Sequence, residues 1–70
     1  MQLGNHLFQA RKKAGLSQEE VAEKLGVSRQ TVSKWETDET LPDIRQSKRM
    51  ALLYKISLDE LIDFDLEVQE

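Results

Sequence analysis

The residues with the most evident chemistry are polar side chains on one side of an expected short helix. They are Arg29, Gln30, Ser33 and Lys34. Arginine can donate two hydrogen bonds to guanine, and glutamine can pair bidentately with adenine. The other side of this helix carries Val32 and Trp35, three residues apart on one apolar stripe. We expect the four polar residues to contact DNA base edges. The alternative is that Arg29 and Lys34 only keep an exposed surface soluble.

A second set of polar residues flanks this helix and suits contacts to phosphate rather than to bases. They are Gln18, Ser28, Thr31, Thr37 and Thr40. Phosphate oxygens bind free backbone amides and small polar groups at the beginnings of helices. Gln18 opens an expected helix and therefore suits this role best, and we expect the serine and the threonines to assist it.

Two short helices joined by a tight turn must position these side chains, and residues 17–36 predict both of them. Ser17 can accept a hydrogen bond from the amide of Glu20, whose side chain can reach back to the amide of Ser17. Gly26 stands where a helix ends in a left-handed residue, and Ser28 is a good N-cap for the second helix. This arrangement is typical of a helix-turn-helix that reads the major groove.

Three further helices are expected around this pair, which makes the predicted fold all-α with five helices. Residues 1–14 carry apolar residues at helical spacing and end at Gly15. A fourth helix should run from a cap at Asp43, with Gln46 at the capping-box position, to about Lys55. A second capping box, formed like that of Ser17 and Glu20, is expected at Ser57 and Glu60 and should open a short fifth helix.

The fourth helix is expected to have an apolar side and a basic side. The core-facing residues should be Ile44, Met50, Ala51 and Tyr54. The outer side should carry Arg45, Lys48 and Arg49. We expect residues 1–62 to form one domain, followed by residues 63–70 as an acidic tail or the start of a linker.

Charge and composition narrow the classes of protein to consider. The net charge of −3 argues against a nucleic-acid partner. However, residues 1–56 hold 10 basic and 7 acidic groups, whereas residues 57–70 hold 6 acidic groups, so the negative charge is concentrated at the C-terminal end. With no cysteine and a single histidine, His6, we expect no metal site, no cofactor and no catalytic centre. No apolar run approaches the roughly 20 residues of a membrane span. No signal peptide is visible, so we expect a soluble cytoplasmic protein.

The ordered set of residues resembles the phage repressor/Cro-type (XRE) helix-turn-helix family of bacterial and phage transcription regulators. The matching residues are Gln18, Ala22, Gly26, Val32, Trp35 and Glu36, with Arg11 upstream and Leu41, Pro42 and the run SLDELI downstream. The resemblance extends from about Leu3 to Ile62. It implies a compact five-helix repressor-like bundle with the helix-turn-helix at helices 2 and 3, base contacts from the third helix and a phosphate contact from Gln18.

The resemblance also implies one structural role and reveals one departure. In the family, an arginine at the position of Arg11 pairs with the glutamate that ends the recognition helix, which is Glu36 here. Related sequences commonly carry a basic residue, a glycine and a second basic residue where this chain has Thr37, Asp38 and Glu39. Two carboxylates near a phosphate backbone should weaken nonspecific affinity.

We therefore expect a transcriptional regulator that binds double-stranded operator DNA as a homodimer. The alternative is a protein-interaction module on the same fold, with acidic surfaces that meet a protein partner. Leu52, Phe64 and Leu66 lack an evident place in so small a core, so we expect the dimer contact in the C-terminal region. Many family members carry a second domain after such an N-terminal segment, so a second domain beyond Glu70 and an end at Glu70 both stay open.

Overall fold

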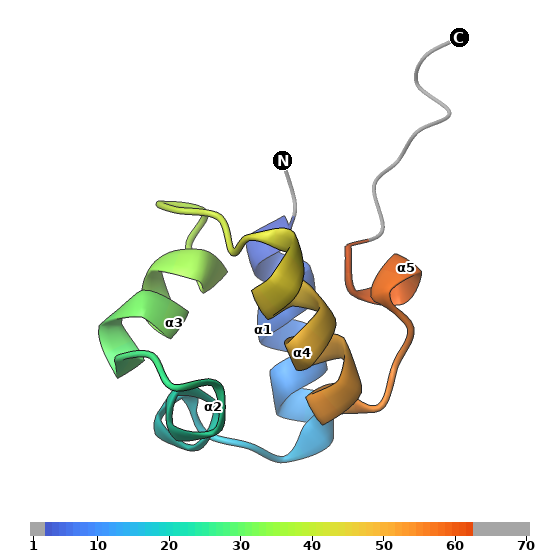
Figure 1. The fold of residues 1–70 in the computed structure, drawn as a ribbon, viewed down its shortest axis with the longest axis horizontal. Coiled ribbons are helices and arrows are strands. Elements are labelled where there is room, and N and C mark those ends of the chain that lie inside the picture. The colour runs from blue at the N-terminus through green and yellow to red at the C-terminus, as the bar shows by residue number, and fades with distance from the viewer. Residues whose placement is uncertain (1–2, 63–70) are drawn as a thin grey trace, which may run out of the picture.

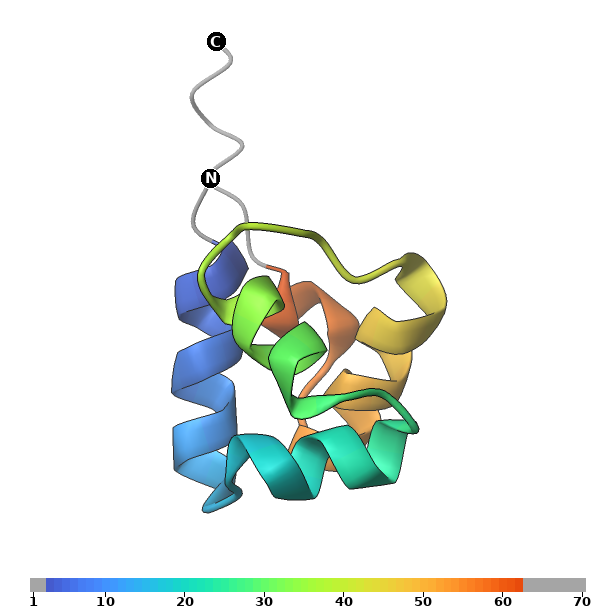
Figure 2. The ribbon, with the colours of Figure 1, turned by 90° about the vertical axis from the view of Figure 1, so that its left-hand side faces the viewer.

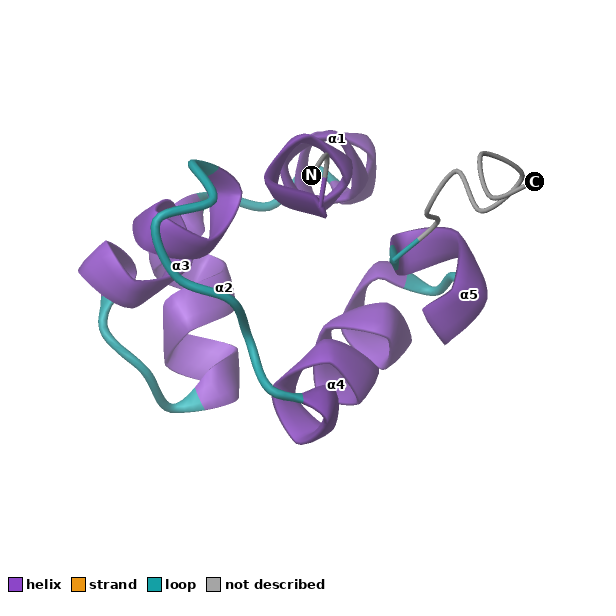
Figure 3. Ribbon diagram, turned by 90° about the horizontal axis from the view of Figure 1, so that it is seen from above, coloured by secondary structure: helices purple, strands orange, loops and turns teal. Residues whose placement is uncertain are grey.

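The computed structural model describes residues 3–62, and every regular element in that range is an α-helix. The five helices are α1 (Leu3–Ala14), α2 (Gln18–Leu25), α3 (Arg29–Glu36), α4 (Ile44–Tyr54) and α5 (Leu58–Leu61). α2 and α3 lie on one side of the α1 and α4 pair, and α5 lies on the other side (Figure 1, Figure 3). The expected all-α fold is therefore confirmed. None of the helices in this range is long and apolar enough to cross a membrane.

Local capping interactions set the boundaries of the helix-turn-helix. Ser17 Oγ accepts from the Glu20 amide at 3.0 Å, and Glu20 Oε1 accepts from the Ser17 amide at 2.8 Å. Gly26 ends α2 with φ of 73°, a conformation that glycine adopts without steric cost. Ser28 Oγ then accepts from the Thr31 amide at 3.1 Å and starts α3. The two expected helices and the turn between them are confirmed.

The second capping box forms as expected, but the start of α4 differs in one detail. Ser57 and Glu60 exchange the two box hydrogen bonds at 2.9 and 3.0 Å. Asp43 caps α4 by accepting from the Gln46 amide at 2.8 Å. Instead of reaching back to the amide of Asp43, the Gln46 side chain accepts from Arg49 Nη1 at 3.4 Å.

Arg49 lies on the exposed basic side of α4, as expected, and its guanidinium also reaches the end of α2. Nη1 donates to the carbonyl of Leu25 and Nη2 to that of Lys24, both at 3.3 Å. These carbonyls lie in the last turn of α2, where they lack partners within the helix. Arg49 therefore joins α4 to the end of α2, and it is exposed like Arg45 and Lys48.

The hydrophobic core lies between all five helices. Its buried apolar residues are Leu3, Leu7, Val21, Ala22, Leu25, Val32, Trp35, Met50, Ala51, Tyr54 and Leu61. The expectation for Ile44 was wrong, because its side chain is 68% exposed, while Ser47 is buried at 4%. Ile44 begins α4 directly after the loop that crosses from α3 (Figure 2). This first turn lies at the edge of the molecule, so the inward stripe begins one turn later, at Ser47.

The beginning of α1 contacts the end of α3 so closely that only a glycine fits there. A Cβ atom on Gly4 would lie 2.5 Å from the carbonyl oxygen of Glu36. The Gly4 amide donates to Asp38 Oδ1 at 2.9 Å, and Asp38 has a left-handed φ of 63°. α1 has no acidic residue in its own first turn, so Asp38 supplies the favourable negative charge at this helix end.

Candidate nucleic-acid interface

The orientation of α3 follows from two buried side chains. Val32 and Trp35 are both within the core. Burying one stripe of a short helix leaves the opposite stripe in solvent. Arg29, Gln30 and Lys34 are accordingly exposed and Ser33 is half-buried, and the four line one hollow of about 260 Å³. The structure thus brings together the side chains expected to contact bases.

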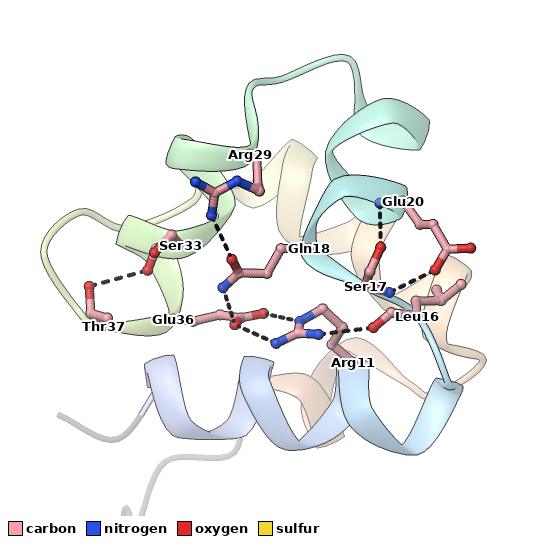
Figure 4. Close-up of polar contacts among 9 residues, drawn as sticks. All are labelled: Arg11, Leu16, Ser17, Gln18, Glu20, Arg29, Ser33, Glu36 and Thr37. Carbon is pink, nitrogen blue, oxygen red and sulfur yellow. Dashed lines mark hydrogen bonds and ion pairs between the residues drawn. The ribbon is translucent and has the colours of Figure 1, made fainter.

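Behind this surface, Arg11 and Glu36 form a buried ion pair. Arg11 Nε donates to Glu36 Oε2 at 2.7 Å, and Nη2 donates to Oε1 at 3.1 Å. Their side chains are only 10% and 5% exposed. Arg11 Nη1 also donates to the carbonyl of Leu16 at 2.9 Å (Figure 4). The expected pair therefore joins α1 to the last turn of α3 and to the segment before α2.

Gln18 extends this ion pair to the surface of α3. Its Nε2 donates to Glu36 Oε1 at 3.0 Å, and its Oε1 accepts from Arg29 Nη1 at 3.2 Å (Figure 4). A glutamine amide has two N–H groups and a guanidinium has five. Each side chain therefore keeps donors for a ligand while its position is set from inside the fold. The sequence placed Gln18 and Arg29 in separate roles, and the structure connects them.

The buried charges also affect the ionisation of their neighbours. The hydrogen bond to Glu36 raises the pKa of Arg11, against the opposing effect of burial, so the guanidinium stays charged. Burial, with a smaller contribution from the charge of Glu36, raises the pKa of Tyr54 to about 12. Within residues 3–62, the Tyr54 hydroxyl is buried and has no hydrogen-bond partner.

The remaining candidates for phosphate contacts lie at the two ends of α3. At its start, Ser28 Oγ and Thr31 Oγ1 are 3.0 Å apart and share one hydrogen bond. Beyond its end, Thr40 is exposed. Ser28 and Thr31 therefore form one polar edge at the start of α3, where Gln18 is hydrogen-bonded to Arg29, and Thr40 belongs to a separate edge.

Thr37 is less available than the sequence suggested. Its hydroxyl lies 3.2 Å from the carbonyl of Ser33, 3.3 Å from that of Lys34 and 3.2 Å from Glu39 Oε2. A hydroxyl has a single hydrogen to donate, and all three neighbours are acceptors. A phosphate oxygen would compete with them for that hydrogen, so Thr37 is better placed to hold the end of α3.

Sequence reasoning missed two roles in the loop after α3. Asp38 and Glu39 were treated together as carboxylates that weaken phosphate contacts. Asp38 instead caps α1, whereas Glu39 lines the same hollow as the exposed polar side chains of α3. The available signal was Gly4, because a glycine inside a helical pattern indicates that another part of the backbone approaches closely.

Comparison with known proteins places these features in a family. A helix-turn-helix family model matches residues 7–61. The chain is 40% identical over 65 residues to the HTH-type transcriptional regulator ImmR of Bacillus subtilis (strain 168), which covers 93% of this chain and 51% of that protein. It is 36% identical over 62 residues to the HTH-type transcriptional activator BcrR of Enterococcus faecalis, covering 89% of this chain and 30% of that one. The chain thus spans about half or less of both relatives.

A solved structure shows the same arrangement of helices. The transcriptional regulator from Listeria innocua matches with a TM-score of 0.82 and 32% sequence identity, over 97% of this chain and 69% of that one. The match of fold, the helix-turn-helix at α2 and α3 and the family model agree with one another. The chain therefore belongs to the phage repressor/Cro-type (XRE) family of helix-turn-helix proteins that its sequence resembles.

Proposed function

We propose that the protein is a cytoplasmic transcriptional regulator that binds operator DNA as a homodimer and reads the major groove with α3. The observation that carries this proposal is the exposed face of α3, where donor and acceptor side chains gather in one hollow. A helix of this width fits the major groove, whose base edges present distinct donor and acceptor patterns. The relatives named as transcriptional regulators support the same assignment.

The buried network supports this proposal by fixing the side chains that would meet DNA. Gln18 is held between Glu36 and Arg29, so its remaining amide hydrogen can face phosphate while Arg29 faces a base. A side chain that is already ordered loses less conformational entropy when it binds. We therefore assign base readout to Arg29, Gln30, Ser33 and Lys34, and backbone positioning chiefly to Gln18.

Selection from random duplexes at low salt tests this proposal. The wild type should recover a preferred sequence, and its affinity should fall steeply as salt rises, because bound phosphates release counterions. Gln30→Ala should lose about 1–3 kcal/mol and relax the preference at one base pair. Gln18→Ala should weaken binding to all duplexes by a similar factor. Gln9→Ala, an exposed glutamine on α1, is the matched control and should change neither quantity.

Two results would contradict the assignment. If Gln30→Ala recovers the wild-type sequence with equal strength, Gln30 does not read bases. If the wild type recovers no preferred sequence at low salt, operator binding fails, and the protein-interaction module becomes the better account.

The homodimer is a separate part of the proposal. Leu52 is 72% exposed on α4 and lines a hollow of about 570 Å³ together with Lys24, Leu25, Arg49 and Leu53. Phe64 and Leu66, which we also expected at the dimer contact, lie outside the described residues. A two-fold dimer should bind half-sites about 34 Å apart. Sedimentation that shows a monomer at high concentration, with and without operator DNA, would contradict it.

A further inference from the structure

Glu39 places a carboxylate among the side chains that would read DNA. It lines the same hollow as Arg29, Gln30, Ser33 and Lys34, although it follows α3 in the chain. A carboxylate that faces a phosphate backbone is repelled by it. A negative charge in this position therefore needs a reason other than general affinity for DNA.

The loop holds Glu39 firmly against the last turns of α3. Its amide donates to the carbonyl of Lys34 at 2.9 Å, and its Oε2 lies 3.2 Å from Thr37 Oγ1. The preceding residue, Asp38, is fixed to α1 through the amide of Gly4. The backbone and one carboxylate oxygen of Glu39 are thus positioned before any ligand binds.

Apart from the Thr37 hydroxyl, no group in the described residues is paired with the Glu39 carboxylate, and no ion pair neutralises its charge. Among residues 3–62, the ion pair is Arg11 with Glu36, so neither Arg29 nor Lys34 closes on the Glu39 carboxylate. An ionised carboxylate can only accept hydrogen bonds, and phosphate oxygens have no hydrogen to donate to it. The donors in the major groove are the amino groups of cytosine and adenine. Beside the adenine amino group lies N7, an acceptor that repels a carboxylate, so cytosine is the better partner.

We propose that Glu39 is a specificity-determining residue that accepts a hydrogen bond from a cytosine amino group, at the end of the half-site nearest the last turn of α3. This inference rests on the proposed function and deepens it. Glu39 lowers affinity for every duplex through repulsion, and it recovers part of that loss only where a cytosine lies opposite it. The carboxylate thereby increases the difference in affinity between operator DNA and other DNA.

Two variants of Glu39 test this in a selection from random duplexes. Titrations then compare the preferred duplex with one that carries T·A in place of the C·G pair assigned to Glu39. The wild type should discriminate between the two duplexes by about tenfold, because thymine presents an acceptor there. Glu39→Gln should lose most of this discrimination and should bind random duplexes as tightly as the wild type or more tightly. Glu39→Asp keeps the charge but shortens the reach, so it should lose discrimination without any gain in affinity.

Glu23→Gln is the matched control, an exposed glutamate on α2 outside the hollow, and it should keep the wild-type discrimination. Equal thermal unfolding of all variants shows that the fold is intact. If Glu39→Gln binds every duplex more tightly by one factor and selects the same sequence, the carboxylate only repels DNA and the proposal is overturned. If the wild type selects no sequence at all, operator binding itself fails, and this inference fails with it.

Discussion

Replacing Glu36 by glutamine should remove the negative charge of the buried ion pair while keeping the size of the side chain. Arg11 would then carry a buried positive charge without its counter-ion. Its bond to the Leu16 carbonyl at 2.9 Å would remain, and the new amide oxygen could accept one bond. Gln18 would lose its carboxylate acceptor, so the position of Arg29 should become less well defined.

The structure sets the size of this effect. Removing one partner of a buried ion pair costs about 3–5 kcal/mol. The two side chains are 10% and 5% exposed, which places the pair within that class. Because two acceptors for Arg11 survive in the variant, we expect the lower end of the range, about 3 kcal/mol. A domain of this length is typically stable by roughly 4–10 kcal/mol, so the loss is a large fraction of the total.

Urea denaturation followed by the fluorescence of Trp35 measures this loss directly, because Trp35 is the single tryptophan and is buried. Lys12→Met is the control, since it removes an exposed charge next to Arg11 and should change stability by less than about 0.5 kcal/mol. A double-mutant cycle with Arg11→Met isolates the energy of the pair. If Glu36→Gln is as stable as Lys12→Met, or if the coupling energy is zero, the buried pair does not stabilise the fold.

Two further substitutions test other parts of the fold. Gly4→Ala should destabilise the protein by about 1–3 kcal/mol in urea denaturation, because the added Cβ would collide with the backbone of Glu36. A gain in stability, as Gly→Ala gives at an exposed helix position, would contradict this close approach. Tyr54→Phe should match or exceed wild-type stability at pH 7 by up to about 1 kcal/mol, because the buried hydroxyl has no partner in the described range. Because the pKa of Tyr54 is raised to about 12, the wild type should lose stability as pH rises from about 10 to 12. Tyr54→Phe should lose less stability over this range. Equal losses would refute the raised pKa.

Much of the fold was predictable because its signals are local. The two capping boxes join residues three apart, so the pairs Ser17 with Glu20 and Ser57 with Glu60 were visible in the sequence. Gly26 marked the turn for a similar reason, since a left-handed residue is needed where a helix ends. Helical periodicity likewise separated the buried stripe of α3 from its exposed side.

Periodicity failed where the limits of the core are set by distant elements. Ile44 lies on the apolar stripe of α4 but is exposed, because the first turn of that helix lies at the edge of the molecule (Figure 2). Spacing along one helix shows which residues share a side. It does not show where the neighbouring helices end, and that depends on how the whole chain packs.

The sequence by itself therefore determined the helices, the turn between α2 and α3 and the polar side of α3, since each depends on residues within about one helical turn of each other. Only the tertiary structure decided how these parts are connected. Asp38 caps α1 across 34 positions, and Gln18 joins the buried ion pair to Arg29 across 11. Such contacts form only once the chain has closed its long loops. No short-range pattern encodes them, so the cap of α1 by Asp38 and the link from Gln18 to Arg29 were decided by the folded chain.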